Sequence, residues 1–239
     1  MDKKISRYII LLCSSLLIAI APAQGQIRDL KFKTESDTLP LLMGGQVFFN
    51  LAGVVLWQAN SYGEIEGGLR LNMKSKYFPT IEAGLGLCDK TDDETDLHCK
   101  ANAPFLRIGC DYNFARDKLS SNRIYGGIRM AYATFKYDLN GPPLSDPYWQ
   151  EQQMPLHFSG LSSNALWAEF VFGIEAKVWR NLHVGWTARY KNRIHQKENE
   201  IGQSFYIPGF GKNSGHRFTG TFNLVFDLGR NFKTNKDNE

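Results

Sequence analysis

Residues 164–194 constrain the fold of this chain most, because they alternate apolar and polar side chains over two long consecutive runs. The apolar positions of the two runs are Leu166, Ala168, Phe170, Phe172, Ile174, Ala176 and Val178, and then Leu182, Val184, Trp186, Ala188 and Tyr190. Side chains of a β-strand point alternately to its two faces, so this period of two predicts a hairpin of two antiparallel strands.

One register satisfies both faces of the predicted hairpin. A turn at residues 179–181 places Val178 opposite Leu182 on the apolar face and Glu169 opposite Lys191 on the polar face. Both runs are longer than the roughly 5 or 6 residues of a typical globular strand, and they reach the roughly 9 to 11 residues of a transmembrane strand. Their length therefore favours a membrane barrel.

Similar alternation predicts eight strands in all, at residues 45–57, 62–73, 77–88, 103–114, 123–137, 166–178, 182–193 and 217–228. Short turns follow the second, fourth and sixth strands, whereas longer segments occupy residues 89–102, 138–163 and 195–216. Only the short connection at residues 58–61 breaks this pattern. Short turns alternating with long loops around an even number of antiparallel strands are typical of outer-membrane barrels. We therefore expect an all-β fold, an eight-stranded antiparallel transmembrane β-barrel of the outer-membrane type.

Charged side chains gather on one face of these strands and are nearly absent from the other. A charge near the bilayer midplane costs roughly 2 to 4 kcal/mol, so a lipid-facing surface excludes charges, whereas charges of both signs can pair inside. We expect a lumen charge network of Glu64, Glu66, Arg70, Glu82, Arg107, Asp111, Arg129, Glu169, Glu175, Arg189, Lys191 and Arg193. The alternative is a soluble calyx of the lipocalin kind, with the apolar face lining a ligand cavity. Such a small cavity would have to enclose most of the large aromatic side chains, so we favour the membrane barrel.

The start of the chain has the pattern of a secretory signal peptide. A basic leader precedes an apolar run at residues 8–20, and residues 21–23 give a small-x-small cleavage pattern. Cleavage after Ala23 and cleavage after Gly25 fit equally well. The alternative, a helical membrane anchor, needs roughly 18 to 20 apolar residues, more than this run provides. We expect a signal peptide at residues 1–25, a flexible periplasmic lead-in at 26–43, the β-barrel at 44–232 and a polar tail at 233–239.

Cysteines of the predicted mature chain lie in a compartment that permits disulfides. Cys88 and Cys99 fall on one face of a hairpin whose register sets Glu82 opposite Phe105, so we expect a disulfide between them. Cys110 falls on the lipid-facing set, where a free thiol behaves as a small apolar residue. The spacing of the cysteines and the neighbouring histidine fits no zinc pattern, and we expect no metal site.

The segment at residues 159–194, followed by FYIPGFGK at residues 205–212 and a closing aromatic strand, resembles an uncharacterised family of outer-membrane β-barrel proteins of Bacteroidota. That family is classed as a domain of unknown function and is similar in build to small eight-stranded outer-membrane proteins. The resemblance covers most of the predicted mature chain and implies a location in the cell outer membrane. It brings no catalytic residues. Many outer-membrane barrels end on an aromatic residue, whereas Phe232 is followed here by a polar tail.

Functional expectations follow from what the sequence lacks as much as from what it holds. The formal net charge of +4 falls to about +2 without the predicted signal peptide, too small an excess to indicate nucleic acid binding. No hydrolase or nucleotide-binding motif is present. His157, Ser159 and Glu169 supply a base, a hydroxyl and a carboxylate, but residues this common coincide often, so we expect no enzyme and no cofactor.

The lumen of an eight-stranded barrel is about filled by its own side chains, so a wide pore is excluded. We expect a membrane anchor that displays extracellular loops for adhesion, for contact with outer-membrane lipid and lipopolysaccharide, or for an extracellular or envelope protein partner. The alternatives are a narrow channel and an outer-membrane lipid-modifying enzyme.

Overall fold

A computed structural model of the chain describes residues 40–60, 62–91, 96–117, 120–145, 153–199 and 201–228. The predicted signal peptide, the lead-in up to residue 39 and the polar tail at 233–239 lie outside these described residues. Within them, the first strand begins at Leu42.

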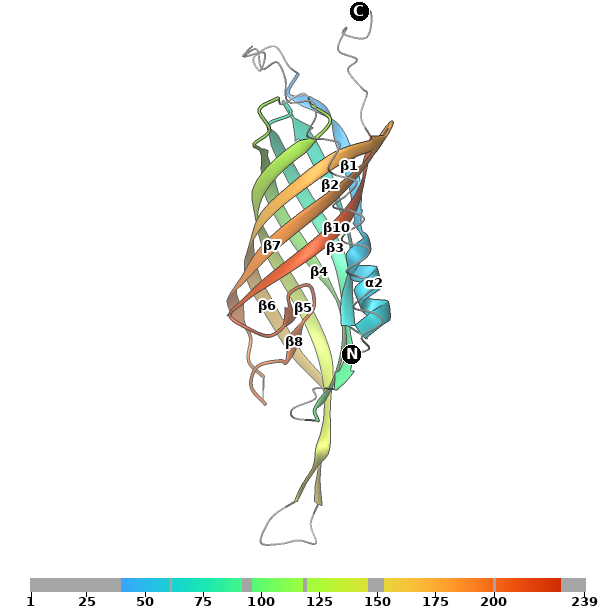
Figure 1. Cartoon of the computed structure of the whole chain (residues 1–239). Coiled ribbons are helices and arrows are strands. Elements are labelled where there is room, and N and C mark those ends of the chain that lie inside the picture. The colour runs from blue at the N-terminus through green and yellow to red at the C-terminus, as the bar shows by residue number, and fades with distance from the viewer. Residues whose placement is uncertain are drawn as a thin grey trace, which may run out of the picture. The chain divides into compact units, whose positions relative to one another are not determined.

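Eight long strands form one antiparallel sheet that closes on itself in a ring, in the order β1-β10-β7-β6-β5-β4-β3-β2 (Figure 1). Their bounds are β1 Leu42–Asn50, β2 Tyr62–Met73, β3 Tyr77–Thr91, β4 His98–Asn113, β5 Arg123–Ser145, β6 Gln153–Trp179, β7 Leu182–Gln196 and β10 His216–Asp227. The remaining elements are the helix α2, Leu51–Asn60, and a small hairpin of β8, Tyr206–Ile207, with β9, Gly211–Lys212. The predicted all-β class and the eight antiparallel strands are confirmed.

The β6–β7 hairpin has the predicted register over most of its length, with Glu169 opposite Lys191. Its turn is tighter than expected: Trp179 pairs with Leu182, and an irregularity in the ladder between Lys177 and Trp179 takes up the difference. The expected pairing of Val178 with Leu182 is therefore wrong. A single bulge changes the partner at the turn without moving the faces of the long strands.

The first predicted strand, residues 45–57, is wrong in its second half, because β1 ends at Asn50 and the chain continues as α2. Asn50 is the N-cap of this helix: its Oδ1 accepts a hydrogen bond of 3.0 Å from the backbone N–H of Ala52. Its side-chain amide also donates to Glu66 Oε1 in the lumen, at 3.0 Å. One residue thus ends the strand, starts the helix and fixes both to the interior.

Helix α2 packs against the outer side of β2 (Figure 1) through two facing glycines, Gly53 and Gly63. A Cβ added at Gly63 would lie 2.6 Å from Trp57 Cβ, and one added at Gly53 would lie 1.9 Å from the backbone oxygen of Glu64. Both distances are far below van der Waals contact, so the helix approaches the strand this closely only because both positions lack a side chain.

Gly63→Ala is expected to loosen α2 while the strand ladder persists, because overpacking of this kind typically costs about 1 to 3 kcal/mol. Amide hydrogen exchange of the α2 backbone in detergent micelles should quicken by about tenfold or more. The matched control is Gly45→Ala, whose added Cβ would have no neighbour closer than 3.9 Å and should leave exchange unchanged. Equal exchange in both variants would contradict a glycine-dependent contact.

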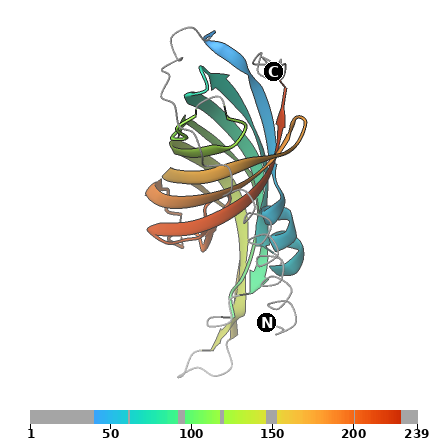
Figure 2. The same ribbon diagram turned by 45° about the horizontal axis from the view of Figure 1, so that its top comes forward.

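Strands β3 to β6 are longer than predicted and take in much of the expected loops at residues 89–102 and 138–163. Pairing of β5 with β6 continues to Ser145 and Gln153, whereas β4 pairs with β5 no further than His98 and Asn140. The end of the β5–β6 hairpin therefore projects beyond the ring, which both ribbon views show (Figure 1, Figure 2).

The register of β3 with β4 differs from the prediction by two residues. Cys88 pairs with Ala101 rather than Cys99, and Glu82 pairs with Arg107 rather than Phe105. A shift of two residues leaves every side chain on its predicted face. The alternation of apolar and polar residues therefore cannot distinguish the predicted register from the observed one.

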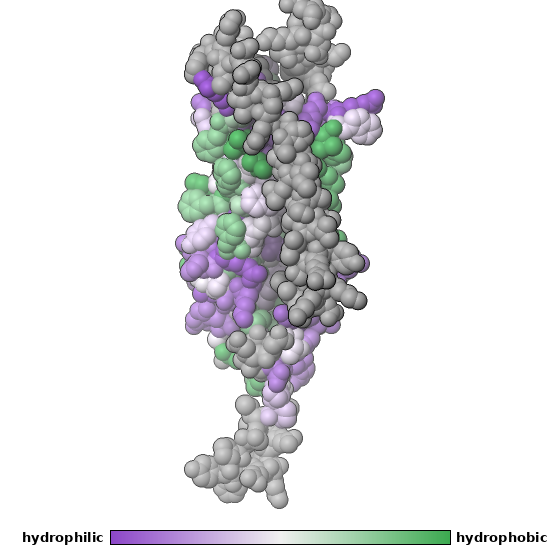
Figure 3. All heavy atoms as spheres, viewed as in Figure 1, coloured by the Kyte–Doolittle hydropathy of each residue, from purple (hydrophilic) through white to green (hydrophobic). Residues whose placement is uncertain are grey.

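The outer face of the ring is apolar over a band of its wall. Each long strand points a large, exposed apolar side chain outward, for example Phe49, Leu69, Ile81, Ile108, Ile128, Phe170, Trp186 and Phe218. Apolar residues gather over the upper part of the wall visible in Figure 3, and polar residues lie below them toward the long loops. Among the residues that the structure describes, no helix is both long and apolar enough to cross a membrane.

Candidate functional site in the lumen

The inward face of the ring concentrates acidic and basic side chains of nearly every long strand. Alternation brings them there, because each strand presents every second residue to the lumen. The side chains in this charge network are Glu64, Glu66, Arg70, Glu82, Arg107, Asp111, Arg129, Glu169, Glu175, Arg189 and Lys191, to which the structure adds Arg123. Arg123 escaped the sequence analysis, although it shares the odd-numbered inward face of β5 with Arg129.

Arg107 lies at the centre of the network and is fully buried. Its Nε donates to Glu169 Oε1 at 2.8 Å, its Nη2 donates to Glu64 Oε2 at 3.1 Å, and its Nη1 pairs with Glu66. Its Nη2 also donates to the backbone carbonyl of Gly209, at 2.7 Å. One guanidinium therefore joins two strands and the β8–β9 segment, using the fixed fork of donors that arginine offers.

Glu82 is a second centre of the network. It forms ion pairs with two arginines: Arg129 Nη1 lies 2.7 Å from its Oε1, and Arg189 Nη1 lies 3.0 Å from its Oε2. Arg189 also reaches Glu66, with Nη2 at 3.2 Å from Oε1, so the Arg107 and Glu82 groups form one continuous cluster. Paired in this way, the buried charges compensate one another, which a low-dielectric interior demands.

The network continues toward the short turns. Arg129 and Arg70 share Asp111, at 3.0 and 3.3 Å from its Oδ2. Arg70 Nη1 also lies 3.0 Å from Glu175, which pairs in turn with Arg123. The chain of ion pairs thus runs lengthwise through the lumen.

Lys191 and Arg193, both expected in the network, have different environments. Lys191 Nζ is buried and lies 3.2 Å from Glu64 Oε1 and 2.6 Å from the Gly209 carbonyl. Arg193 instead donates to Gln196 Oε1 at 2.6 Å, a partner in the segment beyond the network. The register places Arg193 opposite Trp167 and diagonal to Glu169, but its guanidinium binds neutral amide side chains instead.

A second, apolar layer fills the lumen on the long-loop side of the charges. Small inward side chains of β4, β5 and β6 leave room there, and the β8–β9 segment occupies it. The buried members are Cys88, Cys99, Ala101, Ala103, Phe105, Ala131, Ala133, Phe135, Tyr137, Ala165, Trp167, Tyr206, Ile207 and Phe210. Gly209, at φ +81°, fits only as glycine, since a Cβ would lie 2.5 Å from the ring of Phe105. Sequence analysis missed this layer, because insertion of a loop leaves no periodic signal.

Cys88, Cys99 and Cys110 are all free thiols in the structure, so the expected disulfide is not present. Both Cys88 and Cys99 are buried in the apolar layer, and they lie diagonal to each other across the β3–β4 ladder rather than opposite. No group of three or more His, Cys, Asp or Glu side chains that could hold a metal occurs among the described residues.

The possible catalytic set of His157, Ser159 and Glu169 is not brought together. His157 and Glu169 belong to the same strand, and at about 3.3 Å per residue they lie about 40 Å apart. His157 pairs with Asn140 on the exposed hairpin, whereas Glu169 is buried against Arg107. These residues therefore do not act as one site.

Comparison with known proteins assigns the chain to a family through its sequence. None of the curated proteins and none of the solved structures matches it. A family model described as a domain of unknown function (DUF6048) matches residues 5–227, which includes every strand of the ring. The chain therefore belongs to the DUF6048 family.

Proposed function

We propose that this protein is a transmembrane β-barrel of the cell outer membrane, where it serves as an anchor that displays its long-loop end outside the cell. The observation that carries the proposal is the reversal of polarity across the wall: exposed apolar side chains face outward, and paired charges face the lumen. In water the exposed apolar band would be costly, whereas in lipid it is the favourable surface.

The filled lumen supports an anchor rather than a channel. Arg107, Glu82 and Glu169 are almost completely buried, and the apolar layer around Phe210 closes the space beyond them. Water or solute crossing this lumen would have to break several ion pairs at once. A narrow channel is therefore the weaker alternative, and the separation of His157 from Glu169 removes the one set that suggested a lipid-modifying enzyme.

The part most suited to display is the projecting end of the β5–β6 hairpin. Short turns of outer-membrane barrels face the periplasm and long loops face outward, so this hairpin would extend from the cell. Beyond Asn140, β5 and β6 pair only with each other in the described part of the chain. The outer edge of each strand is therefore open to a partner. Adhesion, contact with lipopolysaccharide and binding of an envelope protein are the roles that such a surface fits.

Fractionation tests the location. The mature chain is expected in the outer-membrane fraction, and an unboiled sample is expected to migrate differently from a boiled one on a gel, because a closed barrel resists detergent until heated. Recovery of the chain as a freely soluble periplasmic protein would overturn the proposal.

A further inference from the structure

The wall of the ring is interrupted between β4 and β5. Ala101 pairs with Tyr137 and Phe105 pairs with Ala133, but residues 102–104 have no partners among residues 134–136. Pro104 lies in this gap and has no N–H to donate, which explains a local loss of the ladder. Each strand keeps its other neighbour there, since β4 still pairs with β3 and β5 with β6. The interruption is therefore a defined breach between two strands that are otherwise held in place.

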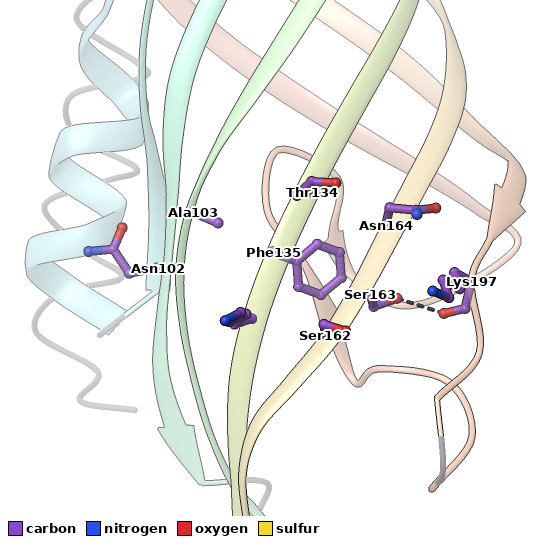
Figure 4. Close-up of a pocket in the computed structure, with 9 residues that line it drawn as sticks. Asn102, Ala103, Thr134, Phe135, Ser162, Ser163, Asn164 and Lys197 are labelled. Atoms are coloured by element: carbon purple, nitrogen blue, oxygen red, sulfur yellow. Dashed lines mark hydrogen bonds between the residues drawn. The ribbon is translucent and has the colours of Figure 1, made fainter.

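A cavity of about 430 Å³ lies at this breach (Figure 4). Its lining includes Ala103 and Phe135, which face inward and belong to the buried apolar layer of the lumen. Its volume falls within the range of roughly 300 to 1,000 Å³ that is usual for small-molecule sites. The cavity thus offers apolar contact on its inner side.

The outer rim of the same cavity is polar and basic. Asn102, Thr134 and Asn164 belong to its lining, together with Lys136 and Lys197. Backbone contacts fix the position of Lys197: its N–H donates to the Asn164 carbonyl at 2.9 Å. Its carbonyl accepts a hydrogen bond of 2.7 Å from Ser163 Oγ, drawn in Figure 4. Within the described residues, neither lysine ammonium group has an ion-pair partner.

The rim also lies where the outer face changes character. At the level of the cavity, the outward residues of β5 and β6 are the polar pair Thr134 and Asn164. Two residues nearer the short turns, the outward pair is Tyr132 and Leu166. If the chain spans the outer membrane, this level is the boundary between acyl chains and headgroups. A molecule that lies across this boundary has an apolar body on one side and a charged group on the other.

We propose that the breach between β4 and β5 is a binding site for an anionic amphiphile, with its charged head at Lys136 and Lys197 and its alkyl chain against Ala103 and Phe135. This inference rests on the proposed membrane location, which supplies the amphiphile. A free inorganic anion would leave the apolar inner side unused, and an uncharged hydrocarbon would leave two uncompensated ammonium groups at the rim. The shared chemistry, an anion on an alkyl chain, belongs both to fatty acids and to phosphorylated lipids.

Native mass spectrometry of the full mature chain in an uncharged detergent tests the site. The probes are palmitate, dodecyl phosphate and dodecanol, added separately. A one-to-one adduct that survives detergent removal is expected with the two anions and not with the alcohol. Retention of palmitate alone identifies a fatty acid site, and retention of dodecyl phosphate alone identifies a site for phosphorylated lipid.

The double variant Lys136→Gln/Lys197→Gln should weaken anion retention by about tenfold or more, because both charge-assisted contacts are lost. Its matched control is Lys177→Gln/Arg180→Gln, two exposed basic residues at the short-turn end, which should bind as the wild type does. A third variant, Ala103→Leu, should reduce binding by filling the inner side, and the heat-dependent gel shift verifies that it folds.

Equal retention of dodecanol, equal binding by the lysine variant, or the lack of any adduct with wild type would each overturn the inference. None of these results bears on outer-membrane location, which fractionation tests separately. Conversely, a chain that binds palmitate through Lys136 and Lys197 but fractionates as a soluble protein would retain the site and refute the proposed function.

Discussion

Replacement of Arg107 by methionine is expected to destabilise the barrel more than any other single substitution of a charged side chain. The change removes the partner of Glu64, Glu66 and Glu169 at once and leaves their carboxylates buried with fewer cations. Breaking a buried pair typically costs about 3 to 5 kcal/mol, and here Glu82, at 3.5 Å from Arg107 Nη1, is a fourth acidic partner that is affected. Urea unfolding of the protein in lipid vesicles, followed by tryptophan fluorescence, measures the loss in the free energy of unfolding.

The matched control is Arg193→Met, which removes the same charge from strand β7. Arg193 hydrogen-bonds neutral amide side chains outside the network, so its replacement should cost less than about 1.5 kcal/mol. A double-mutant cycle of Arg107→Met with Glu169→Gln adds a sharper readout, because two side chains in direct contact should show a coupling energy of about 0.5 to 3 kcal/mol. Equal losses for Arg107 and Arg193, or a coupling near zero, would refute the central role of Arg107.

The long strands were predictable because alternation is a local signal that a closed two-faced sheet repeats many times. Residues 164–194 gave both strands and the register of Glu169 with Lys191, since an error of one residue would have turned the apolar face inward. Register errors of two residues escape this test. That is why the β3–β4 pairing was misplaced while the faces of Glu82 and Arg107 were correct.

The helix α2 was not predictable from periodicity. Residues 51–57 are apolar and include β-branched side chains, so they read equally well as the end of a strand. Asn50 is a favourable N-cap, but the same residue also suits a turn, and only the lumen contact with Glu66 explains why the strand stops there. The contact of Asn50 with Glu66, rather than the local sequence, therefore determines that the strand ends and the helix begins at this point.

The partners within the charge network were also beyond the sequence. Alternation predicts which side chains point into the lumen. Which of them form ion pairs depends on the closure of the sheet, which brings distant strands together across the lumen. Arg70 pairs with Glu175, 105 residues away, and Arg189 with Glu82, 107 residues away. The contact of Glu169 with Arg107, on another strand, was not foreseen either.

No steady ion current is expected from the wild-type protein in planar lipid bilayers, because two different layers close its lumen. The charge network around Arg107 fills one level, and Tyr206, Ile207 and Phe210 fill the next. An eight-stranded barrel leaves room for little beyond its own side chains, so either layer alone should suffice.

The two layers can be removed separately. Replacing residues 204–212 with a short Gly-Ser linker removes Tyr206, Ile207 and Phe210 from the apolar layer. The bilayer should stay silent, because Glu82, Glu169 and Arg189 still pair. Adding Arg107→Ser and Glu169→Ser to this variant, which changes no net charge, should open a water path and give steady currents. Gel migration before and after boiling verifies that each variant is folded. Large, steady currents from the wild type would refute the closed lumen and favour the channel, and silence of the combined variant would show that further side chains block the path.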